Sequence, residues 1–261
     1  MVFGNEGENM IYITGDCHSD FTRIMNPYIF KEQHKMTKDD FVIIAGDFGG
    51  IWCQGESPDE KKKLDKLNSL SFTTLFIDGN HENYDRLYNE YPIMDWNGGK
   101  VHKIRNSVFH LMRGQVFELC GKKIFTFGGA SSHDISGGVL EKDAPDFKKR
   151  KQELDREWIS YRVNHYSWWK EELPSDEEME DGLKNLEKNH NEVDYIITHC
   201  CASSTQETFA AGLYEKDYLT DYLDVIKEKV EFKKWFFGHY HINENISEKE
   251  ICLYEQIIQI A

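Results

Sequence analysis

Short apolar runs separated by polar stretches dominate the first half of the chain. Three of these runs have the length and composition of buried strands: residues 10–14, 41–45 and 73–77. Residues 57–70 predict a helix, because Ser57 can cap it, Pro58 suits its first turn and acidic residues precede lysines. The resulting order of strand, helix and strand predicts parallel β-α-β units.

The second half of the chain predicts further strands and helices. Ser175 and Glu178 have the spacing of a capping box at the start of a helix over residues 175–189. Residues 131–170 are polar and aromatic, and predict an irregular insertion. The remaining predicted elements are short strands within residues 101–127 with a turn at Cys120-Gly121, a strand at 193–198, an amphipathic helix at 217–230, a strand at 235–237 and a terminal hairpin at 246–260.

Composition limits the classes of function. With 261 residues, 39% of them hydrophobic, the chain can bury a sizeable core, and we expect a single domain over residues 1–261 with an insertion at about 130–170. The formal net charge of −15 argues against duplex nucleic acid as a partner, but not against a small phosphorylated substrate, because bound metal ions can invert the local charge.

The sequence also predicts a compartment. It contains no run of about 18 apolar residues, so we expect no membrane-spanning helix. The first nine residues lack the pattern of a signal peptide and predict a disordered lead-in. The six cysteines follow no disulfide framework. We therefore expect reduced thiols in a cytoplasmic protein of unknown oligomeric state.

Polar clusters follow five of the predicted strands. They are Gly15-Asp16-Cys17-His18, Gly46-Asp47, Gly79-Asn80-His81-Glu82, Thr198-His199 and Gly238-His239-Tyr240-His241. Each cluster alone has a simpler interpretation as a capped turn, but together they hold five of the 11 histidines. Ligand sites in open α/β sheets are built at the carboxyl ends of the strands, which favours one shared site.

The chemistry of these clusters predicts a metal centre. Two aspartates, one asparagine and four histidines form a mixed set of donors, which suits manganese, iron or zinc better than calcium or magnesium. Seven ligands are too many for one ion and suit two ions that share a carboxylate. Such a pair can clamp the attacking and leaving oxygens of a displacement at phosphorus.

The motif series GDxH, GD, GNHE, H and GHxH resembles that of the calcineurin-like metallophosphoesterase superfamily. The motifs extend from Asp16 to His241 and so cover most of the chain. The resemblance implies an α/β fold, a four-layer sandwich of two facing mixed β-sheets flanked by helices. It also implies which side chains hold the two metal ions: Asp16, His18 and His241 at one ion, Asn80, His199 and His239 at the other, and Asp47 between them.

A mechanism follows from the same resemblance. A hydroxide that bridges the two metals attacks phosphorus, and the metals neutralise the developing charge. His81 protonates the leaving oxygen or stabilises the transition state. An alternative for His81 is a supporting hydrogen-bonding role behind the ligands.

The sequence departs from one branch of this superfamily. Protein Ser/Thr phosphatases carry GDxHG and GDxxDRG, whereas here Ser19 follows His18, and Gly50 stands where that branch has its second aspartate. We therefore expect no protein phosphatase of that type. The segment GGASSHD at residues 128–134, with Tyr161-Arg162 and residues 167–171, is similar to a bacterial and phage-associated subgroup.

That likeness puts the insertion near the active site. We expect Arg162 or His133 to contact the substrate phosphate, the alternative being a surface lobe in which Arg162 pairs with an acid. The leading functional hypothesis is a metal-dependent hydrolase of phosphate esters, a phosphatase or a phosphodiesterase. A nuclease or cyclic-nucleotide phosphodiesterase on the same site is a second hypothesis, and a non-catalytic metal-binding scaffold is a third.

Overall fold

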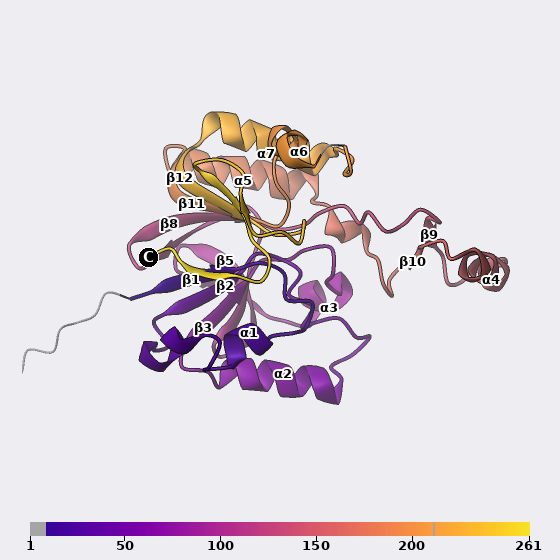
Figure 1. Ribbon diagram of the computed structural model, residues 1–261, viewed down its shortest axis with the longest axis horizontal. Helices are drawn as coiled ribbons and strands as arrows, with labels where there is room; N and C mark the ends of the chain where they lie inside the picture. Colours follow the sequence, from indigo (N-terminus) through magenta and orange to yellow (C-terminus); the bar gives the residue numbers. More distant parts are fainter. Residues whose placement is uncertain (1–8, 211) are drawn as a thin grey trace, which may run out of the picture.

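The computed structural model describes residues 9–210 and 212–261, so the predicted disordered lead-in lies almost entirely outside the described residues. Two mixed β-sheets face each other and helices cover their outer faces (Figure 1). Sheet I has the order β15-β1-β2-β3-β6-β5-β4, with β1 Ile11–Thr14, β2 Phe41–Ile44, β3 Thr73–Phe76, β4 Ile93–Trp96, β5 Gly99–Arg105, β6 Val108–Leu111 and β15 Ile257–Gln259. Sheet II has the order β13-β14-β12-β11-β8-β7, with β7 Gln115–Leu119, β8 Lys122–Phe127, β11 Glu192–Thr198, β12 Glu231–Phe237, β13 Glu244–Asn245 and β14 Glu250–Cys252. The predicted arrangement of two facing mixed sheets is confirmed.

Parallel pairing in the centre of each sheet brings strand ends to a common edge. In sheet I, β1 pairs with β2, β2 with β3 and β3 with β6, all in parallel. In sheet II, β11 lies parallel to both β8 and β12. Only the outer strands run antiparallel, as in the pair of β1 with β15. The carboxyl ends of the central strands therefore meet, as the β-α-β pattern predicted.

The helices form the two outer layers. Beside sheet I lie α1 (Thr22–Met25), the 3₁₀ helix η1 (Lys31–Lys35), α2 (Pro58–Asn68) and α3 (Tyr84–Asn89), and beside sheet II lie α5 (Asp176–Lys188), α6 (Ser203–Phe209) and α7 (Tyr218–Lys229) (Figure 1). The capping box predicted for Ser175 and Glu178 is present: the Ser175 hydroxyl accepts from the Glu178 amide, and the Glu178 carboxylate accepts from the Ser175 amide. Such a cap contributes about 1 kcal/mol to helix stability.

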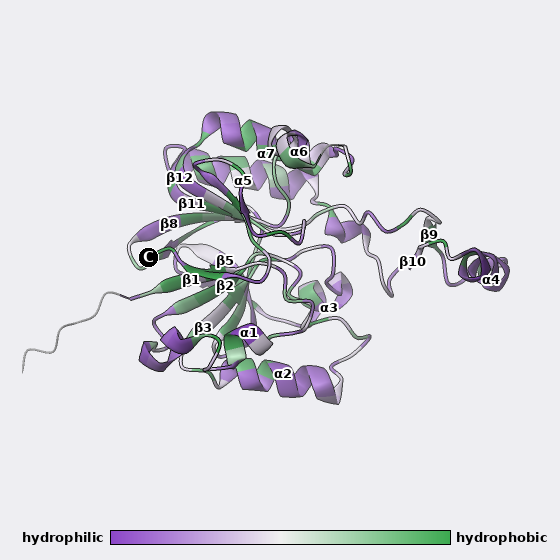
Figure 2. Cartoon of the chain, viewed as in Figure 1, coloured by the Kyte–Doolittle hydropathy of each residue, from purple (hydrophilic) through white to green (hydrophobic). Residues whose placement is uncertain are grey.

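Alternating side chains divide the core into three layers. Ile11 and Ile13 point between the sheets and pack with residues of sheet II such as Phe236, whereas Tyr12 points outward toward the α2 side. Successive strand side chains face opposite sides, so one strand serves two layers. Burying each Ile or Leu contributes about 1.5–3 kcal/mol. Figure 2 shows the result as apolar strands inside and polar outer helix faces.

The insertion forms an arm that projects from the sandwich (Figure 1). It contains β9 (Val139–Leu140), α4 (Phe147–Glu157) and β10 (Arg162–Val163), and β9 pairs with β10 in parallel. The chain returns through the 3₁₀ helix η2 (Lys170–Glu172). The prediction of irregular structure was therefore wrong for residues 147–157. The reason is that α4 is highly charged and has no buried residue, so it lacks the apolar stripe by which a helix is recognised.

The C-terminal prediction was also wrong. Instead of one hairpin over residues 246–260, β14 pairs with β13 and β12 in sheet II, and the chain then crosses to sheet I, where β15 pairs with β1. These strands are only two or three residues long, so the local pattern could not specify their partners.

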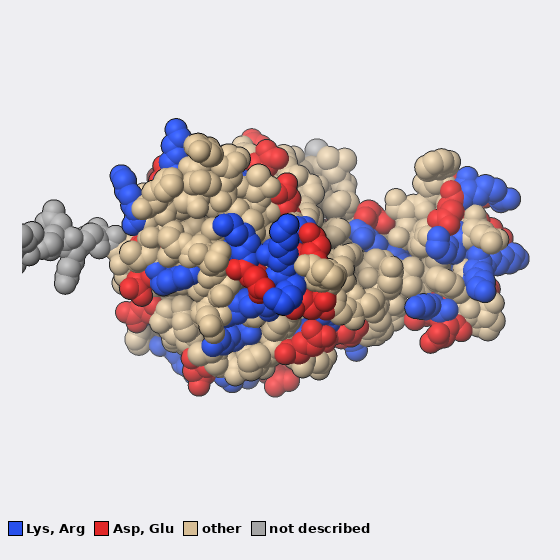
Figure 3. All heavy atoms as spheres, turned by 90° about the horizontal axis from the view of Figure 1, so that it is seen from below, with Lys and Arg blue, Asp and Glu red and all other residues tan. Residues whose placement is uncertain are grey.

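On the side that carries α2, acidic and basic side chains are interspersed, and Lys and Arg gather on the arm (Figure 3). All six cysteines are free thiols, consistent with the sequence. Within the described ranges, the structure contains no helix with the length and apolarity needed to span a membrane.

Candidate metal centre

The side chains predicted as metal ligands meet where the carboxyl ends of the central strands converge. Asp16 and His18 follow β1, Asp47 follows β2 and Asn80 follows β3, whereas His199 follows β11 and His239 and His241 follow β12. Backbone hydrogen bonds join these loops: the His18 amide donates to the Asp47 carbonyl at 2.8 Å. The His239 amide donates to Asp16 Oδ1 at 3.0 Å and so links the two sheets.

The backbone at the site is held in conformations that most residues avoid. Positive φ angles occur at four of the predicted ligands: His18 (44°), Asp47 (42°), His239 (68°) and His241 (53°). Strain of this kind persists where surrounding structure enforces it, and it is common at functional sites. Gly79 is required for close approach, because a Cβ there would collide with the Asp47 carboxylate.

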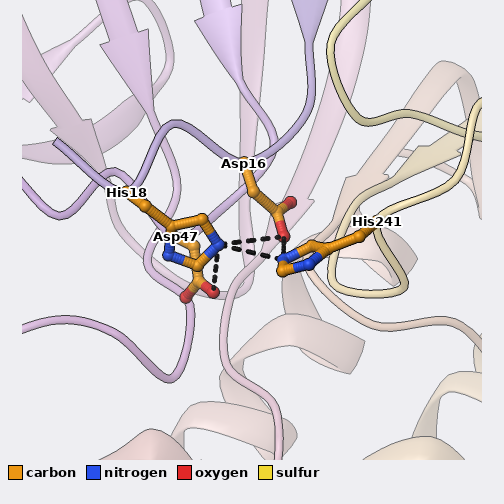
Figure 4. Close-up of side chains that lie close together, drawn as sticks. All are labelled: Asp16, His18, Asp47 and His241. Carbon is orange, nitrogen blue, oxygen red and sulfur yellow. Dashed lines mark hydrogen bonds and ion pairs between the residues drawn. The ribbon is translucent and has the colours of Figure 1, made fainter. Parts of the chain in front are cut away.

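One group of donors converges on a small volume (Figure 4). Donor atoms of Asp16, His18, Asp47 and His241 all lie within 4.8 Å of one another. His18 Nε2 is 2.9 Å from His241 Nε2, and His241 Nε2 is 3.1 Å from Asp16 Oδ2. His18 Nε2 also lies 3.7 Å from Asp47 Oδ2. Two imidazole nitrogens and two carboxylates thus point at the same place.

A second group adjoins the first through Asp47. His199 Nε2 lies 3.3 Å from Asp47 Oδ1 and 3.3 Å from Asn80 Oδ1. The rings of His199 and His239 have centroids 5.0 Å apart. His199 Nδ1 is 3.0 Å from the Ala45 carbonyl, which fixes the orientation of the ring and leaves Nε2 facing the site. Asp47 has one carboxylate oxygen toward each group.

The electrostatics of the site fit a bound cation. Burial alone would raise the pKa of Asp47, but His199 holds that pKa well below its usual range. Burial alone would lower the pKa of His199, yet Asp47 raises it to about 9. The carboxylates therefore stabilise positive charge, which a divalent cation can supply while the imidazoles bind it in their neutral form. Burial lowers the pKa of His239 far below its ordinary value, which keeps that ring neutral.

His81 follows Asn80 in the chain and lies beside the first group, but it is not part of that donor cluster. Its amide donates to Asp47 Oδ1 at 2.8 Å, its ring packs edge-on against His18 at 4.9 Å, and its other side stacks on Trp52 at 5.6 Å. In the described part of the chain, neither ring nitrogen has a hydrogen-bond partner. His81 lines a hollow of about 290 Å³ together with His18 and Trp52. It is thus positioned to exchange a proton with a ligand.

Two residues that the sequence analysis did not assign orient Asn80. Asn80 Nδ2 donates to Ser132 Oγ at 3.4 Å, and Ser132 Oγ donates to Glu172 Oε2 at 2.6 Å. The Ser132 amide donates to Glu172 Oε1 at 2.9 Å. Because the hydroxyl proton goes to Glu172, Ser132 Oγ can only accept from Asn80, which turns the amide oxygen toward His199. Ser132 lies in the GGASSHD segment, but Glu172 had no local signal.

The two predicted substrate contacts lie near the site in different settings. His133 packs edge-on against His239, with ring centroids 5.6 Å apart. Arg162 forms a two-bond pair with Asp134, with Nε 2.9 Å from Oδ1 and Nη2 2.5 Å from Oδ2. This pairing with an acid is the alternative that the sequence left open for Arg162. The Arg162 charge still reaches the site, since it is one of the influences that lower the pKa of His81, after burial and His18.

A buried charge network supports the turn between β3 and Asn80. The Asp78 carboxylate accepts from Arg113 Nε at 2.8 Å and from the Tyr84 hydroxyl at 2.9 Å, and lies 3.0 Å from His110 Nε2. The Tyr84 hydroxyl also lies 2.6 Å from the Gly79 carbonyl. Arg113 and His110 hold the pKa of Asp78 below its usual range despite burial, which alone would raise it.

Comparison with known proteins agrees with this geometry. The family model of the calcineurin-like phosphoesterases matches residues 10–243, which include every predicted metal ligand and His81. Among curated proteins, no sequence matches this chain. Members of this family hydrolyse phosphoesters with divalent metal ions, and the cluster around Asp16 and His241 can hold such an ion. The chain is a member of the calcineurin-like phosphoesterase family.

Proposed function

We propose that the protein is a dinuclear metal-dependent hydrolase of phosphate esters that acts on a small phosphorylated substrate. The observation that carries this proposal is the convergence of the donor atoms of Asp16, His18, Asp47 and His241 within 4.8 Å of one another. These residues would hold one ion of manganese, iron or zinc. Asn80, His199 and His239 would hold the second, with Asp47 shared between the two ions.

Ions held there would lower the pKa of water and neutralise charge on the phosphate oxygens. The chain's own residues supply the remaining functions. Asp47 accepts from the His81 amide and joins two loops of sheet I, and Asp16 accepts from the His239 amide and joins the two sheets. His81 has ring nitrogens without partners in the described residues and faces a hollow, so it can protonate the oxygen that leaves phosphorus. His133, whose ring packs against that of His239, would contact the substrate.

Hydrolysis of p-nitrophenyl phosphate and bis(p-nitrophenyl) phosphate tests the proposal. The protein is reconstituted with Mn²⁺, and bound metal is counted alongside turnover. We expect metal-dependent turnover that falls by about 10²–10⁴-fold in His81→Ala, as is typical when a general acid is lost. We expect Asp47→Asn to lose both metal and turnover.

Matched controls separate these effects from general damage. His34 and Asp39 are exposed and lie outside the site, so His34→Ala and Asp39→Asn should behave as the wild type. Absence of bound metal in the wild type would sink the hydrolase proposal. Two bound metals with full activity in His81→Ala would remove His81 from the mechanism.

A further inference from the structure

A cavity of about 550 Å³ opens beside His239, and His81 is not among its lining residues. Three segments far apart in the sequence form its walls: residues 130–136 after β8, residues 168–173 at the base of the arm, and residues 213–217 between α6 and α7. Its size falls within the range of pockets that enclose small organic ligands. It shares no lining residue with the hollow of about 290 Å³ at His81, so the metal centre has two separate spaces beside it.

The two spaces suit the two ester groups of a phosphodiester. His81, the proposed acid, lines the smaller hollow, so the leaving alcohol must lie there. In a monoester no other organic group exists, and the larger cavity would remain unused. Resting on the proposed function, we propose that the substrate is a phosphodiester, and that the ester group retained on phosphorus is an uncharged, ring-bearing group held in the cavity beside His239.

The charges of the cavity exclude an additional anionic group. Glu172, Glu215 and Asp217 line it, and its single lysine, Lys216, already pairs with Glu207. Among the described residues, no arginine lines the cavity. A second phosphate or a carboxylate on the retained group would therefore meet negative charge with no free basic side chain in the described lining, and would lose its hydration without compensation.

The wall facing the metal centre is aromatic. Tyr214 packs edge-on against His133 at 5.4 Å and against Tyr240 at 4.8 Å, and is tilted against His239 at 5.9 Å. Trp168 also lines the cavity, and its indole N–H approaches the Glu172 carboxylate in the same wall. These aromatic side chains suit a sugar or aromatic ring.

The proposed reaction converts a diester and water into a monoester and an alcohol. A water oxygen becomes bonded to phosphorus and the P–O bond on the His81 side breaks. The leaving oxygen takes the proton that His81 donates, and the proton released by the attacking water restores the imidazole. The retained ester group stays in the cavity and leaves as part of the monoester product.

Three diesters with the same leaving group test the proposal: the methyl, phenyl and 4-carboxyphenyl esters of p-nitrophenyl phosphate. We expect kcat/KM for the phenyl ester to exceed that for the methyl ester about tenfold, mainly through KM, because only the phenyl ring can pack against the aromatic wall of the cavity. The carboxyphenyl ester should fall below the phenyl ester. The monoester p-nitrophenyl phosphate should be a poorer substrate than the phenyl diester.

Variants of Tyr214 connect this preference to the cavity. Tyr214→Ala should bring the phenyl-to-methyl ratio close to one, whereas Tyr214→Phe and the exposed control Tyr28→Ala should keep it. Equal rates for the methyl and phenyl esters in the wild type, or a ratio unchanged in Tyr214→Ala, would overturn the assignment of the cavity. Faster hydrolysis of the monoester than of all three diesters would overturn the assignment of a phosphodiester substrate. Failure to hydrolyse any of these esters would overturn the proposed function itself, and this inference with it.

Discussion

The orientation of the Asn80 amide depends on a chain of hydrogen bonds whose polarity can be reversed by one substitution. Ser132 Oγ gives its proton to Glu172 and accepts from Asn80 Nδ2, so Asn80 Oδ1 faces the metal centre. In Glu172→Gln, the glutamine oxygen must accept from the Ser132 amide and its NH₂ must donate to Ser132 Oγ. The Ser132 proton then points at Asn80 and favours an amide turned by 180°, with NH₂ toward the metal.

The burial and lengths of these hydrogen bonds set the free energy that a substitution costs. Asn80, Ser132 and Glu172 are each at most 6% exposed, so water cannot replace a lost partner easily. The bond from Asn80 to Ser132 is long at 3.4 Å, which puts its own contribution near the lower end of about 0.5–1.5 kcal/mol. In Ser132→Ala the Asn80 NH₂ loses that partner, and leaving a buried donor unpaired costs about 1–3 kcal/mol.

These free energies predict changes of about tenfold in Mn²⁺ affinity. We expect Ser132→Ala to weaken Mn²⁺ binding about tenfold, since 1.4 kcal/mol corresponds to a factor of ten. Glu172→Gln should weaken Mn²⁺ binding at least as much, because it favours the wrong orientation rather than merely releasing the correct one. In Glu172→Gln all the hydrogen bonds can still form, so the melting temperature without metal should change little, whereas Ser132→Ala should lower it.

Isothermal titration with Mn²⁺ and thermal unfolding of the metal-free protein measure both quantities. Ser131→Ala is the matched control, because the Ser131 hydroxyl donates to Asp217 instead. Glu171→Gln controls for the loss of a negative charge next to Glu172. Wild-type Mn²⁺ affinity in Glu172→Gln, or an equal loss in Ser131→Ala, would refute the reasoning.

Three further predictions concern stability, pH and the turn after β3. Burial lowers the pKa of His102 to about 3, so below pH 6.5 the unfolded chain binds a proton that the folded chain does not, and the free energy of unfolding should fall by up to about 1.4 kcal/mol per pH unit. Urea unfolding at pH 7.5 and pH 5 should show a smaller loss of stability with acid in His102→Asn than in the wild type. Arg113→Met leaves the buried Asp78 carboxylate without its main partner and should cost about 3–5 kcal/mol in urea unfolding, whereas the double variant Asp78→Asn/Arg113→Met should cost less. Gly79→Ala should abolish tight Mn²⁺ binding in titration, because its Cβ would displace a ligand carboxylate, whereas Gly55→Ala, whose Cβ meets open space, should bind normally.

The sequence by itself determined the central strands and the polar clusters that follow them. The runs that became β1, β2 and β3 were apparent because buried parallel strands are almost wholly apolar and end abruptly at a Gly or Asp. The capping box at Ser175 was equally local. Because parallel strands share one carboxyl edge, the clusters could be expected to meet, and they do.

Only the tertiary structure decided which distant groups support those clusters. Glu172 reaches Ser132 across 40 positions of the chain, and the cavity beside His239 needs three separate segments to close. The chain likewise crosses from β14 in sheet II to β15 in sheet I, where β15 pairs with the free edge of β1, and that edge exists only once sheet I has formed. Patterns of hydrophobicity and turn residues act over a few positions, whereas these contacts depend on the packing of the two sheets. The sequence could therefore predict which polar side chains converge on one place, but not the side chains that orient them or the space beside them.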